Sequence, residues 1–224
     1  MTSHLPAIVV FGDVVDSRAD AGASEFLRAL RDELEAAYAG RRLAPAGFTQ
    51  GDELQLLLAP GADPFVAVLR AALDPRGREL RWAIVAGDVL PGSGPTTERS
   101  GPAFIEAREL LERAKARREG LLAVSGDPSA DALLAELGPV LAALLGELTP
   151  RQREVARLLL VDDLRQADAA ERLGVSRATV SVIAARAHVR HLAALASALG
   201  RTFREGVERA AAAAAAAPIP VGAA

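Results

Sequence analysis

Two Gly-Asp pairs place carboxylates where apolar stretches are interrupted. The stretch VVFGDVVDSR turns from apolar to acidic at Gly12-Asp13, and the stretch GFTQGDELQLLL holds a second pair, Gly51-Asp52. Two carboxylates within bridging distance repel each other unless a cation lies between them. Oxygen ligands without His or Cys suit Mg²⁺ or Mn²⁺, which is commonly carried with a triphosphate. We therefore predict Asp13 and Asp52 as metal ligands, with the glycines letting backbone N–H groups approach phosphate.

The strands that hold these acids decide whether they meet. The run AIVVFGDVV is typical of a buried strand, and GFTQGDELQLLL reads as a hairpin that turns at its Gly-Asp pair. In a sheet of β-α-β-β order the first strand lies beside the hairpin, which brings Asp13 close to Asp52, with Glu53 as a further acid. Ordinary turn chemistry is the alternative interpretation, and capping of the next helix best explains Asp16.

The N-terminal part of the chain alternates strand-like and helix-like patterns. Their order is β-α-β-β-α-β and then α-β, which predicts an α+β fold with a ferredoxin-like or palm (βαββαβ) mixed sheet and its helices on one face. Ser24 is the expected cap of the first helix. The expected strands are 7–15, 47–58 (as a hairpin), 80–90 and 121–126, and the expected helices are 24–38, 64–73 and 102–117.

Charge is unevenly distributed along the chain, which indicates two modules. Residues 1–148 hold 15 basic and 22 acidic side chains, a net charge of −7, whereas residues 149–209 hold 11 and 7, a net charge of +4. A basic segment suits a polyanion, although a solvated helical face is the plainer explanation. The predicted organisation is a sheet domain at 1–126, a helical connector at 127–148, a helical domain at 149–209 and a low-complexity tail at 210–224.

The composition excludes several classes of protein. The chain has no cysteine, so disulfides, thiolate metal sites and cysteine nucleophiles are excluded. No stretch reaches the uninterrupted apolar length of a membrane span, and the N-terminus lacks the pattern of a secretory signal. We therefore expect a cytoplasmic protein without a membrane partner.

The segment that begins at Thr149 has the helix starts and the turn of a helix-turn-helix. Thr149, Pro150 and Gln152 form a capping-box pattern, and Gly174 can take the left-handed backbone that ends a helix before Ser176 caps the next one. The apolar residues at matching spacing are Ala170, Leu173, Val175, Val180 and Ile183. The predicted contacts with double-stranded DNA are Gln166, Ser176, Arg177, Thr179, Ser181 and Arg186, with Arg190 and His191 continuing along the same helix.

The stretches LTPRQREVARLLL and AAERLGVSRATVS resemble the helix-turn-helix of bacterial regulators of the sigma-region-four or LuxR type, over about residues 147–195. That resemblance implies that the segment binds DNA. A three-helix bundle that binds another protein is the alternative interpretation.

The blocks GDVVDSR, TQGDELQLLL, LRWAIVAGDV and SGPAFIEARELLERAK resemble the SatD family over about residues 7–118, and more distantly the class III nucleotide cyclases. The resemblance implies a palm in which Asp13 and Asp52 bind metal ions on a triphosphate, and Arg108 matches a catalytic arginine. Phe104 stands at the position of the catalytic asparagine, and Phe48 near that of the base-selecting lysine, which argues against turnover. The implied nucleotide contacts are Gly12, Val14, Ser17, Arg18, Gly51, Glu53 and Arg108.

These patterns predict a transcription regulator whose sheet domain senses a purine nucleotide with Mg²⁺ or Mn²⁺ and whose helical domain binds double-stranded DNA. Dimerisation is expected, because many regulators read two half-sites. One alternative is an active nucleotidyl cyclase or related phosphoryl-transfer enzyme. Another is a scaffold whose helical domain binds protein.

Overall fold

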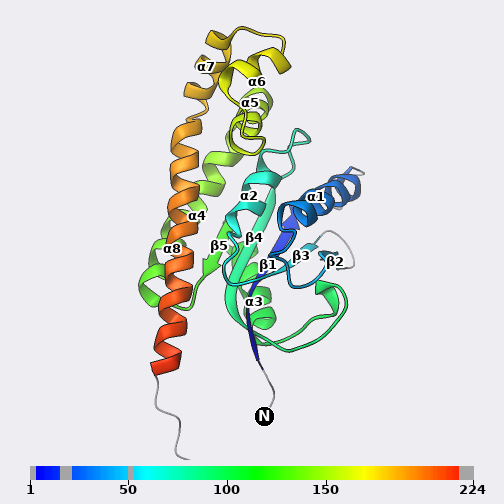
Figure 1. The fold of residues 1–224 in the computed structure, drawn as a ribbon, viewed down its shortest axis with the longest axis vertical. Coiled ribbons are helices and arrows are strands. Elements are labelled where there is room, and N and C mark those ends of the chain that lie inside the picture. Colours follow the sequence, from blue (N-terminus) through cyan, green and yellow to red (C-terminus); the bar gives the residue numbers. More distant parts are fainter. Residues whose placement is uncertain (1–3, 16–21, 50–52, 217–224) are drawn as a thin grey trace, which may run out of the picture.

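The computed structural model describes residues 4–15, 22–49 and 53–216 of the chain (Figure 1). It shows the predicted α+β fold, in which a five-stranded mixed sheet is followed by an all-helical region. The strands are β1 (Leu5–Val14), β2 (Gly47–Phe48), β3 (Glu53–Leu58), β4 (Leu80–Val89) and β5 (Leu121–Val124).

The sheet order β2-β3-β1-β4-β5 confirms the predicted β-α-β-β-α-β arrangement with one strand added. β1 is central and pairs antiparallel with both β3 and β4, and β2 pairs antiparallel with β3. The last predicted strand, β5, pairs parallel with β4, and the helix between them supplies the crossover connection that parallel neighbours need. In this register Asp13 of β1 lies opposite Glu53 on one side and Arg81 on the other, so the first strand does adjoin the hairpin.

Eight α-helices and one short 3₁₀ helix, η2 (Thr96–Glu98), connect and cover these strands within the described part of the chain. The third α-helix begins at a proline, as predicted, and Gly101 before it has a φ of 138°. A Cβ on Gly101 would lie 2.7 Å from the Cα of Val89, so both the backbone angle and the close approach to β4 require glycine at this position. The α-helices are α1 (Ala23–Ala37), α2 (Phe65–Ala72), α3 (Pro102–Arg117), α4 (Pro128–Gly146), α5 (Pro150–Leu160), α6 (Gln166–Arg172), α7 (Arg177–Arg186) and α8 (Val189–Ala216).

The expectation that all helices cover one face of the sheet is wrong. Ile8 and Val10 of β1 pack with α1 and α2, whereas Val9 and Phe11 point to the opposite face and pack with α3. The physical reason is visible in β1, whose residues 7–11 are all buried because the strand is apolar on both faces. Such a continuous apolar run requires cover on each side.

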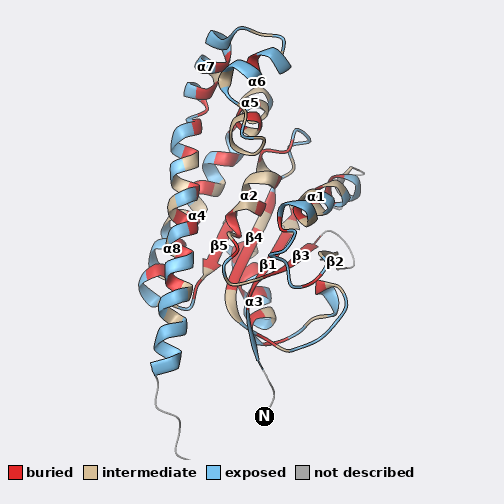
Figure 2. Cartoon of the chain, in the orientation of Figure 1, coloured by how far each residue is buried: buried red, intermediate tan, exposed pale blue. Residues whose placement is uncertain are grey.

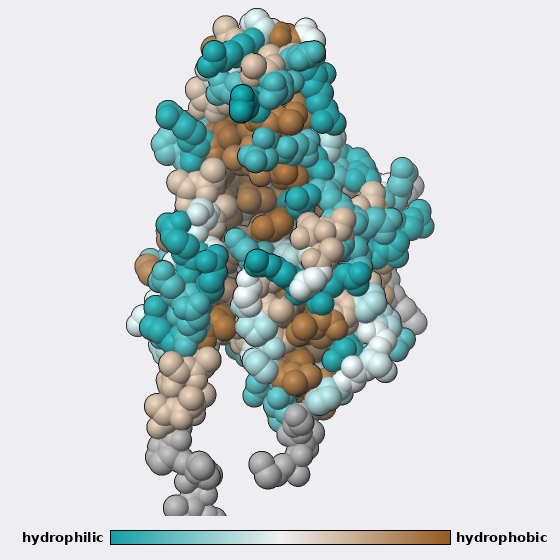
Figure 3. All heavy atoms as spheres, viewed as in Figure 1, coloured by the Kyte–Doolittle hydropathy of each residue, from teal (hydrophilic) through white to brown (hydrophobic). Residues whose placement is uncertain are grey.

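Helices α4 and α8 attach the helical region to the sheet. Helix α4 packs on β5, and α8 runs back beside α4 towards the sheet (Figure 1). Buried residues of β4, α4, α5, α7 and α8 belong to the same apolar core as those of α1 and α2. Figure 2 shows buried positions on the facing sides of α4 and α8, and Figure 3 shows apolar side chains gathered in a hollowed region over α2 and α5.

Among the described residues, α4 is the one helix long and apolar enough, by length and composition alone, to cross a membrane. Core helices of soluble proteins pass the same test. In this structure 28% of that stretch is buried, so most of its residues face outward. The buried ones, including Leu134, Gly138 and Leu141, form the side that packs on β5 and α8.

Two local predictions are corrected. The first α-helix begins at Ala23, after Gly22, so Ser24 lies inside it and is not its cap. Arg190 and His191 do not continue the helix of Arg186, because α7 ends there and His188 takes a left-handed backbone with φ 51° before α8 begins. The predicted turn at Gly51-Asp52 and the predicted cap at Asp16 lie outside the described residues.

Candidate functional site

The helix-turn-helix is built from local signals that the structure bears out. Thr149 accepts a hydrogen bond from the Gln152 backbone N–H while the Gln152 side chain accepts one from the Thr149 N–H, which completes the predicted capping box at the start of α5. Gly174 has a φ of 63° in the turn after α6, and Ser176 caps α7 by accepting from the Thr179 backbone N–H. These caps set the start of α7 and the path of the turn before it.

The inner side of α7 is packed into the helical core. Val180 and Ala184 are buried, and Ile183 packs against the same core. The other predicted core residues behave as expected, because Ala170 is buried and Leu173 and Val175 pack against the cluster. A helix held along one side in this way presents its other side in a fixed orientation.

The outer side of α7 carries most of the predicted DNA contacts. Ser176, Arg177, Thr179, Ser181 and Arg186 are all exposed. The Ser176 and Thr179 hydroxyls lie 2.9 Å apart at the start of the helix. Their position beside the first backbone N–H groups of a helix suits a phosphate oxygen.

Gln166 is half-buried and lies apart from the start of α7. It lines a hollow of about 420 Å³ together with Ser181 and His188, between α6, α7 and the start of α8. The sequence prediction missed Val182, which is 50% exposed beside Ser181. Helical spacing from the buried Val180 and Ala184 could have revealed it as a candidate apolar contact with a thymine methyl group.

The second candidate site lies on the α3 side of the sheet, at the end of β1. Asp13 is half-buried there and stands opposite Glu53 of β3. The predicted partner Asp52 lies outside the described residues, as do Ser17, Arg18 and Gly51. The described residues therefore place one predicted metal ligand, Asp13, together with the further acid Glu53.

Packing accounts for two of the predicted nucleotide contacts. A Cβ on Gly12 would lie 2.8 Å from the Trp82 ring, so this glycine makes room for the indole on the neighbouring strand. Val14 is buried in the core beneath α1 and α2, which leaves only its backbone available to a ligand. Neither residue presents a side chain to the face that carries Asp13.

Glu53 is held in an internal cluster. One carboxylate oxygen accepts from the Arg108 guanidinium, and the other accepts from Gln55 Nε2 at 2.7 Å. The guanidinium carbon of Arg108 also lies 4.8 Å from the centre of the Phe11 ring, which favours a cation on its face. Arg108, predicted from resemblance to contact nucleotide, thus contacts an acid and an aromatic ring of its own chain.

Asp13 faces a cation as well. Lys115, the single lysine of the chain, places its Nζ 3.4 Å from an Asp13 carboxylate oxygen and 3.2 Å from a Glu112 oxygen. Partial burial of Lys115 acts to lower its pKa, but the negative charges of Asp13 and Glu112 outweigh that effect and raise it. The pattern of buried residues Ala107, Leu111 and Ala114 could have predicted that Arg108 and Lys115 lie along one side of α3.

Asp13 and Glu53, the two described acids of this site, are each paired with a basic side chain of α3, namely Lys115 and Arg108. Among the described residues no group of three or more His, Cys, Asp or Glu side chains is placed to hold a metal ion. Phe104 lies with its ring centre 6.1 Å from that of Phe11, so the residue at the predicted asparagine position packs on the sheet. A metal at Asp13 would have to compete with Lys115.

Replacing Arg108 with methionine is expected to destabilise the fold by about 2 kcal/mol, because it leaves the Glu53 carboxylate buried without its cation. The Glu53 side chain is 6% exposed and that of Arg108 is 46% exposed, so the loss is smaller than for a fully buried pair. Urea unfolding measures it. The exposed Arg113→Met on the same helix is the control, and adding Glu53→Gln to Arg108→Met should restore much of the loss. Equal stability of Arg108→Met and Arg113→Met would contradict the assignment.

Comparisons with known proteins bear on the helical region first. Residues 140–188 match the family described as Sigma-70, region 4, which covers the end of α4 and all of α5, α6 and α7. No curated protein matches the chain. The resemblance of residues 7–118 to the SatD family stays a prediction.

Some solved structures match this chain at low similarity. One is a bacterial light-regulated adenylyl cyclase, with 13% identity and a TM-score of 0.39 over 56% of this chain and 44% of that chain. A second structure of a bacterial light-regulated adenylyl cyclase also has 13% identity and a TM-score of 0.39, over 55% of this chain and 77% of that chain. A regulator of polyketide synthase expression from Bifidobacterium adolescentis has 18% identity and a TM-score of 0.28, over 90% of this chain and 82% of that chain. The chain thus spans less than half of the first cyclase chain. The helix-turn-helix of α6 and α7 lies within the segment that matches sigma-70 region 4.

Proposed function

We propose that this protein is a transcription regulator that binds double-stranded DNA through α7. The observation that carries the proposal is the exposed side of α7, within the segment that matches sigma-70 region 4. Arg177 would contact a guanine edge or a phosphate in the major groove, and Ser176 and Thr179 would hold phosphates. Ser181 and Arg186 continue the contact along the same exposed side.

Selection of duplexes from a random pool tests this function, followed by measurement of Kd at several salt concentrations. A sequence-specific regulator should enrich one motif, and the logarithm of its affinity should fall linearly with the logarithm of salt concentration. Failure to retain any duplex at low salt would favour the scaffold alternative, in which the helical region binds protein.

We also propose that the sheet domain senses a purine nucleotide with Mg²⁺ or Mn²⁺ at Asp13 and Asp52. The support is the position of Asp13 at the end of β1, beside the hairpin strand β3. The bound ion would replace Lys115 as the partner of Asp13, and a change in the position of α3 would accompany binding. A ligand can regulate DNA binding only if it favours one arrangement of the two regions.

Replacing Lys115 with methionine is expected to strengthen binding of Mn²⁺ with ATP or GTP several-fold, because it removes the cation that competes for Asp13. Calorimetric titration measures the effect, and Asp13→Asn should abolish binding. Absence of binding in both the parent and Lys115→Met would contradict nucleotide sensing and leave DNA binding untouched. Formation of a cyclic or transferred nucleotide product that is lost in Asp13→Asn would instead support the enzyme alternative.

The outward face of α4 supports a homodimer. Leu133, Val140 and Leu144 are 49%, 46% and 38% exposed, and with the half-buried Leu137 they follow the four-three-four spacing of a helix–helix seam. Between residues 132 and 146 the one charged side chain is Glu136. A face without basic residues does not suit an anionic lipid surface, whereas a second copy of the same apolar face would bury it.

Replacing Val140 with glutamate is expected to shift the protein from dimer to monomer, because it puts a carboxylate in the middle of that apolar stripe. Light scattering during size-exclusion chromatography measures the mass. The control is Ile105→Glu, which changes an apolar side chain that is 65% exposed on α3. A monomeric parent protein at micromolar concentration, or a dimer unaffected by Val140→Glu, would reject α4 as the contact.

A further inference from the structure

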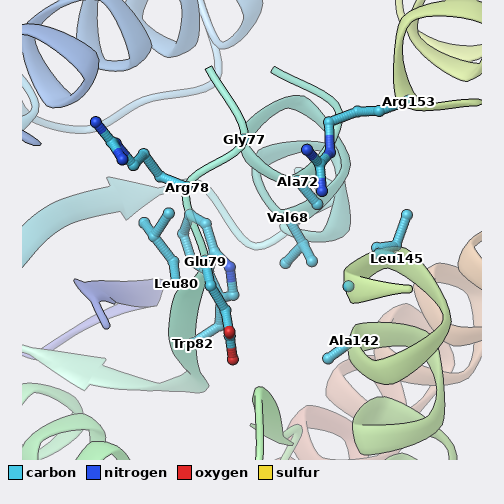
Figure 4. Close-up of a pocket in the computed structure, with 11 residues that line it drawn as sticks. Val68, Ala72, Gly77, Arg78, Glu79, Leu80, Trp82, Ala142, Leu145 and Arg153 are labelled. Carbon is cyan, nitrogen blue, oxygen red and sulfur yellow. The ribbon is translucent and has the colours of Figure 1, made fainter. Parts of the chain in front are cut away.

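A cavity of about 140 Å³ lies where the sheet domain meets the helical region. Its walls come from α2, the segment between α2 and β4, the start of β4, the end of α4 and the start of α5, as Figure 4 shows. The walls are largely apolar, with Val68, Leu80, Trp82, Ala142 and Leu145 around the space. This place is on the opposite face of the sheet from Asp13, Glu53 and Arg108.

One basic side chain of the cavity has unused hydrogen-bonding capacity. Arg153 of α5 is half-buried and points towards Ala72 and Gly77 in Figure 4. Its Nε is buried and has no hydrogen-bond partner among the described residues, and its Nη2 makes one long contact, 3.4 Å, with the Leu148 carbonyl. A buried guanidinium donor without a partner is costly in a native protein. Because Arg153 lines the cavity and its Nη2 makes this one long contact, the end of the guanidinium can still donate to an acceptor there.

Gly77 makes the approach of Arg153 possible. A Cβ at this position would lie 2.6 Å from Arg153 Nη1, and Gly77 also takes a backbone with a φ of 68° that favours glycine. The loop therefore leaves room for the guanidinium beside the cavity. The same segment also contributes the half-buried Arg78 and the exposed Glu79 to the lining, two side chains of opposite charge.

The size and the walls limit what the cavity can take. An apolar cavity of about 150 Å³ holds one benzene ring. Trp82, buried between Gly12 and this space, offers an aromatic surface against which a second ring can pack. A triphosphate would not fit this volume. Because Arg78 and Glu79 carry opposite charges, Arg153 leaves one net positive charge among the lining residues, which suits a ligand with a single negative charge.

We propose that this cavity binds a small aromatic monocarboxylate, with its ring against Trp82 and Leu145 and its carboxylate on Arg153. The site joins residues of the sheet domain to α5, the first helix of the helix-turn-helix. Occupancy would fix α5 relative to β4 and so alter the presentation of α7 to DNA. This ligand would act independently of the nucleotide proposed for the opposite face of the sheet.

Ligand binding in this cavity can be followed by tryptophan fluorescence, because Trp82 is the only tryptophan of the chain. Titration of the full-length protein with benzoate, followed by tryptophan fluorescence, should saturate with half-saturation at or below about 1 mM, as expected for a ligand of this size. Uncharged benzamide, of the same shape, should bind at least about tenfold more weakly, since it lacks the charge-assisted bond to Arg153.

Two variants and one control locate the binding. Arg153→Gln should weaken benzoate at least about tenfold by removing the charge, and Ala72→Leu should abolish binding by filling the cavity from α2. Arg151→Gln removes the same charge two residues earlier on α5 and should leave the titration unchanged. Because Ala72→Leu keeps Arg153, the assignment can be tested even if Arg153→Gln fails to fold.

Three results would overturn the proposal: no saturable fluorescence change, equal binding of benzamide, or equal loss in Arg151→Gln. DNA affinity measured with saturating benzoate should change at least about twofold in the parent and not in Ala72→Leu. An unchanged affinity in both would overturn the regulatory role. None of these results bears on whether the protein binds DNA or nucleotide.

Discussion

Replacing Arg177 with alanine should weaken binding of the selected DNA by about 1–3 kcal/mol, or roughly 5- to 150-fold in Kd. Arg177 is the first residue of α7 and is exposed beside the Ser176 cap. Because Val180 and Ala184 hold the inner side of the helix in the core, the Arg177 side chain is presented from a rigid base. The measurement is a titration of fluorescent duplex at fixed salt concentration.

The same variant distinguishes base recognition from phosphate contact. If Arg177 reads a guanine edge, selection with the alanine variant should lose its preference at one base pair of the motif. If it holds a phosphate, affinity should fall uniformly across sequences and the salt slope should decrease by about 0.9. The matched control is Arg201→Ala, an exposed arginine on α8 outside the matched segment. Unchanged DNA affinity in Arg177→Ala would mean that α7 is not the recognition helix.

Much of the helical region could be predicted because its signals are local. The Thr149–Gln152 capping box, the glycine at 174 and the Ser176 cap each act within four residues, and all three appear where expected. The order of strands was predictable for a related reason, since each apolar run was bounded by turn residues and short connections leave few topologies. Local rules therefore gave both the element order and the start of the recognition helix.

What the sequence did not reveal depends on contacts between distant segments. The ion pair of Lys115 with Asp13 requires α3 to cover the face opposite α1, which the element order alone does not decide. The sequence predicted that Gly12 lets the backbone approach a phosphate. In the structure its neighbour across the sheet is Trp82, whose ring occupies the space that a side chain at this position would fill. The cavity beside Arg153 is likewise formed by segments far apart in the chain, from α2 to α5.

The return of α8 along α4 was not predicted, and Gly206 marks where α8 meets the start of α4 and the segment that joins β5 to it. A Cβ on Gly206 would clash with Ser125 Oγ and lie 2.7 Å from the Ala130 Cβ. Ser125 cannot easily move, because its backbone N–H and its hydroxyl both donate to one oxygen of Asp131, at 2.6 and 2.7 Å. Close packing of α8 on this corner thus requires glycine.

Replacing Gly206 with valine should therefore destabilise the protein by about 3 kcal/mol, since two extra methyl groups follow the Cβ into a filled space. Urea unfolding at equilibrium measures the loss. Gly206→Ala isolates the steric effect when it is compared with Gly146→Ala, where nothing lies within 4 Å of the new Cβ. Both changes gain up to about 1 kcal/mol of helix propensity, so only the variant at Gly206 should lose stability.

The result also tests how the helical region is attached to the sheet. Arg209 on the same helix donates to Asp127 at 2.9 Å, so α8 reaches the N-terminus of α4 as well as Ser125. If α8 is displaced in Gly206→Val, the Phe203 side chain loses its place against Phe65 of α2, and the sheet and α7 lose a shared support. DNA affinity and stability should then fall together. Equal stabilisation by Gly206→Ala and Gly146→Ala would instead show that α8 does not pack at this corner in solution.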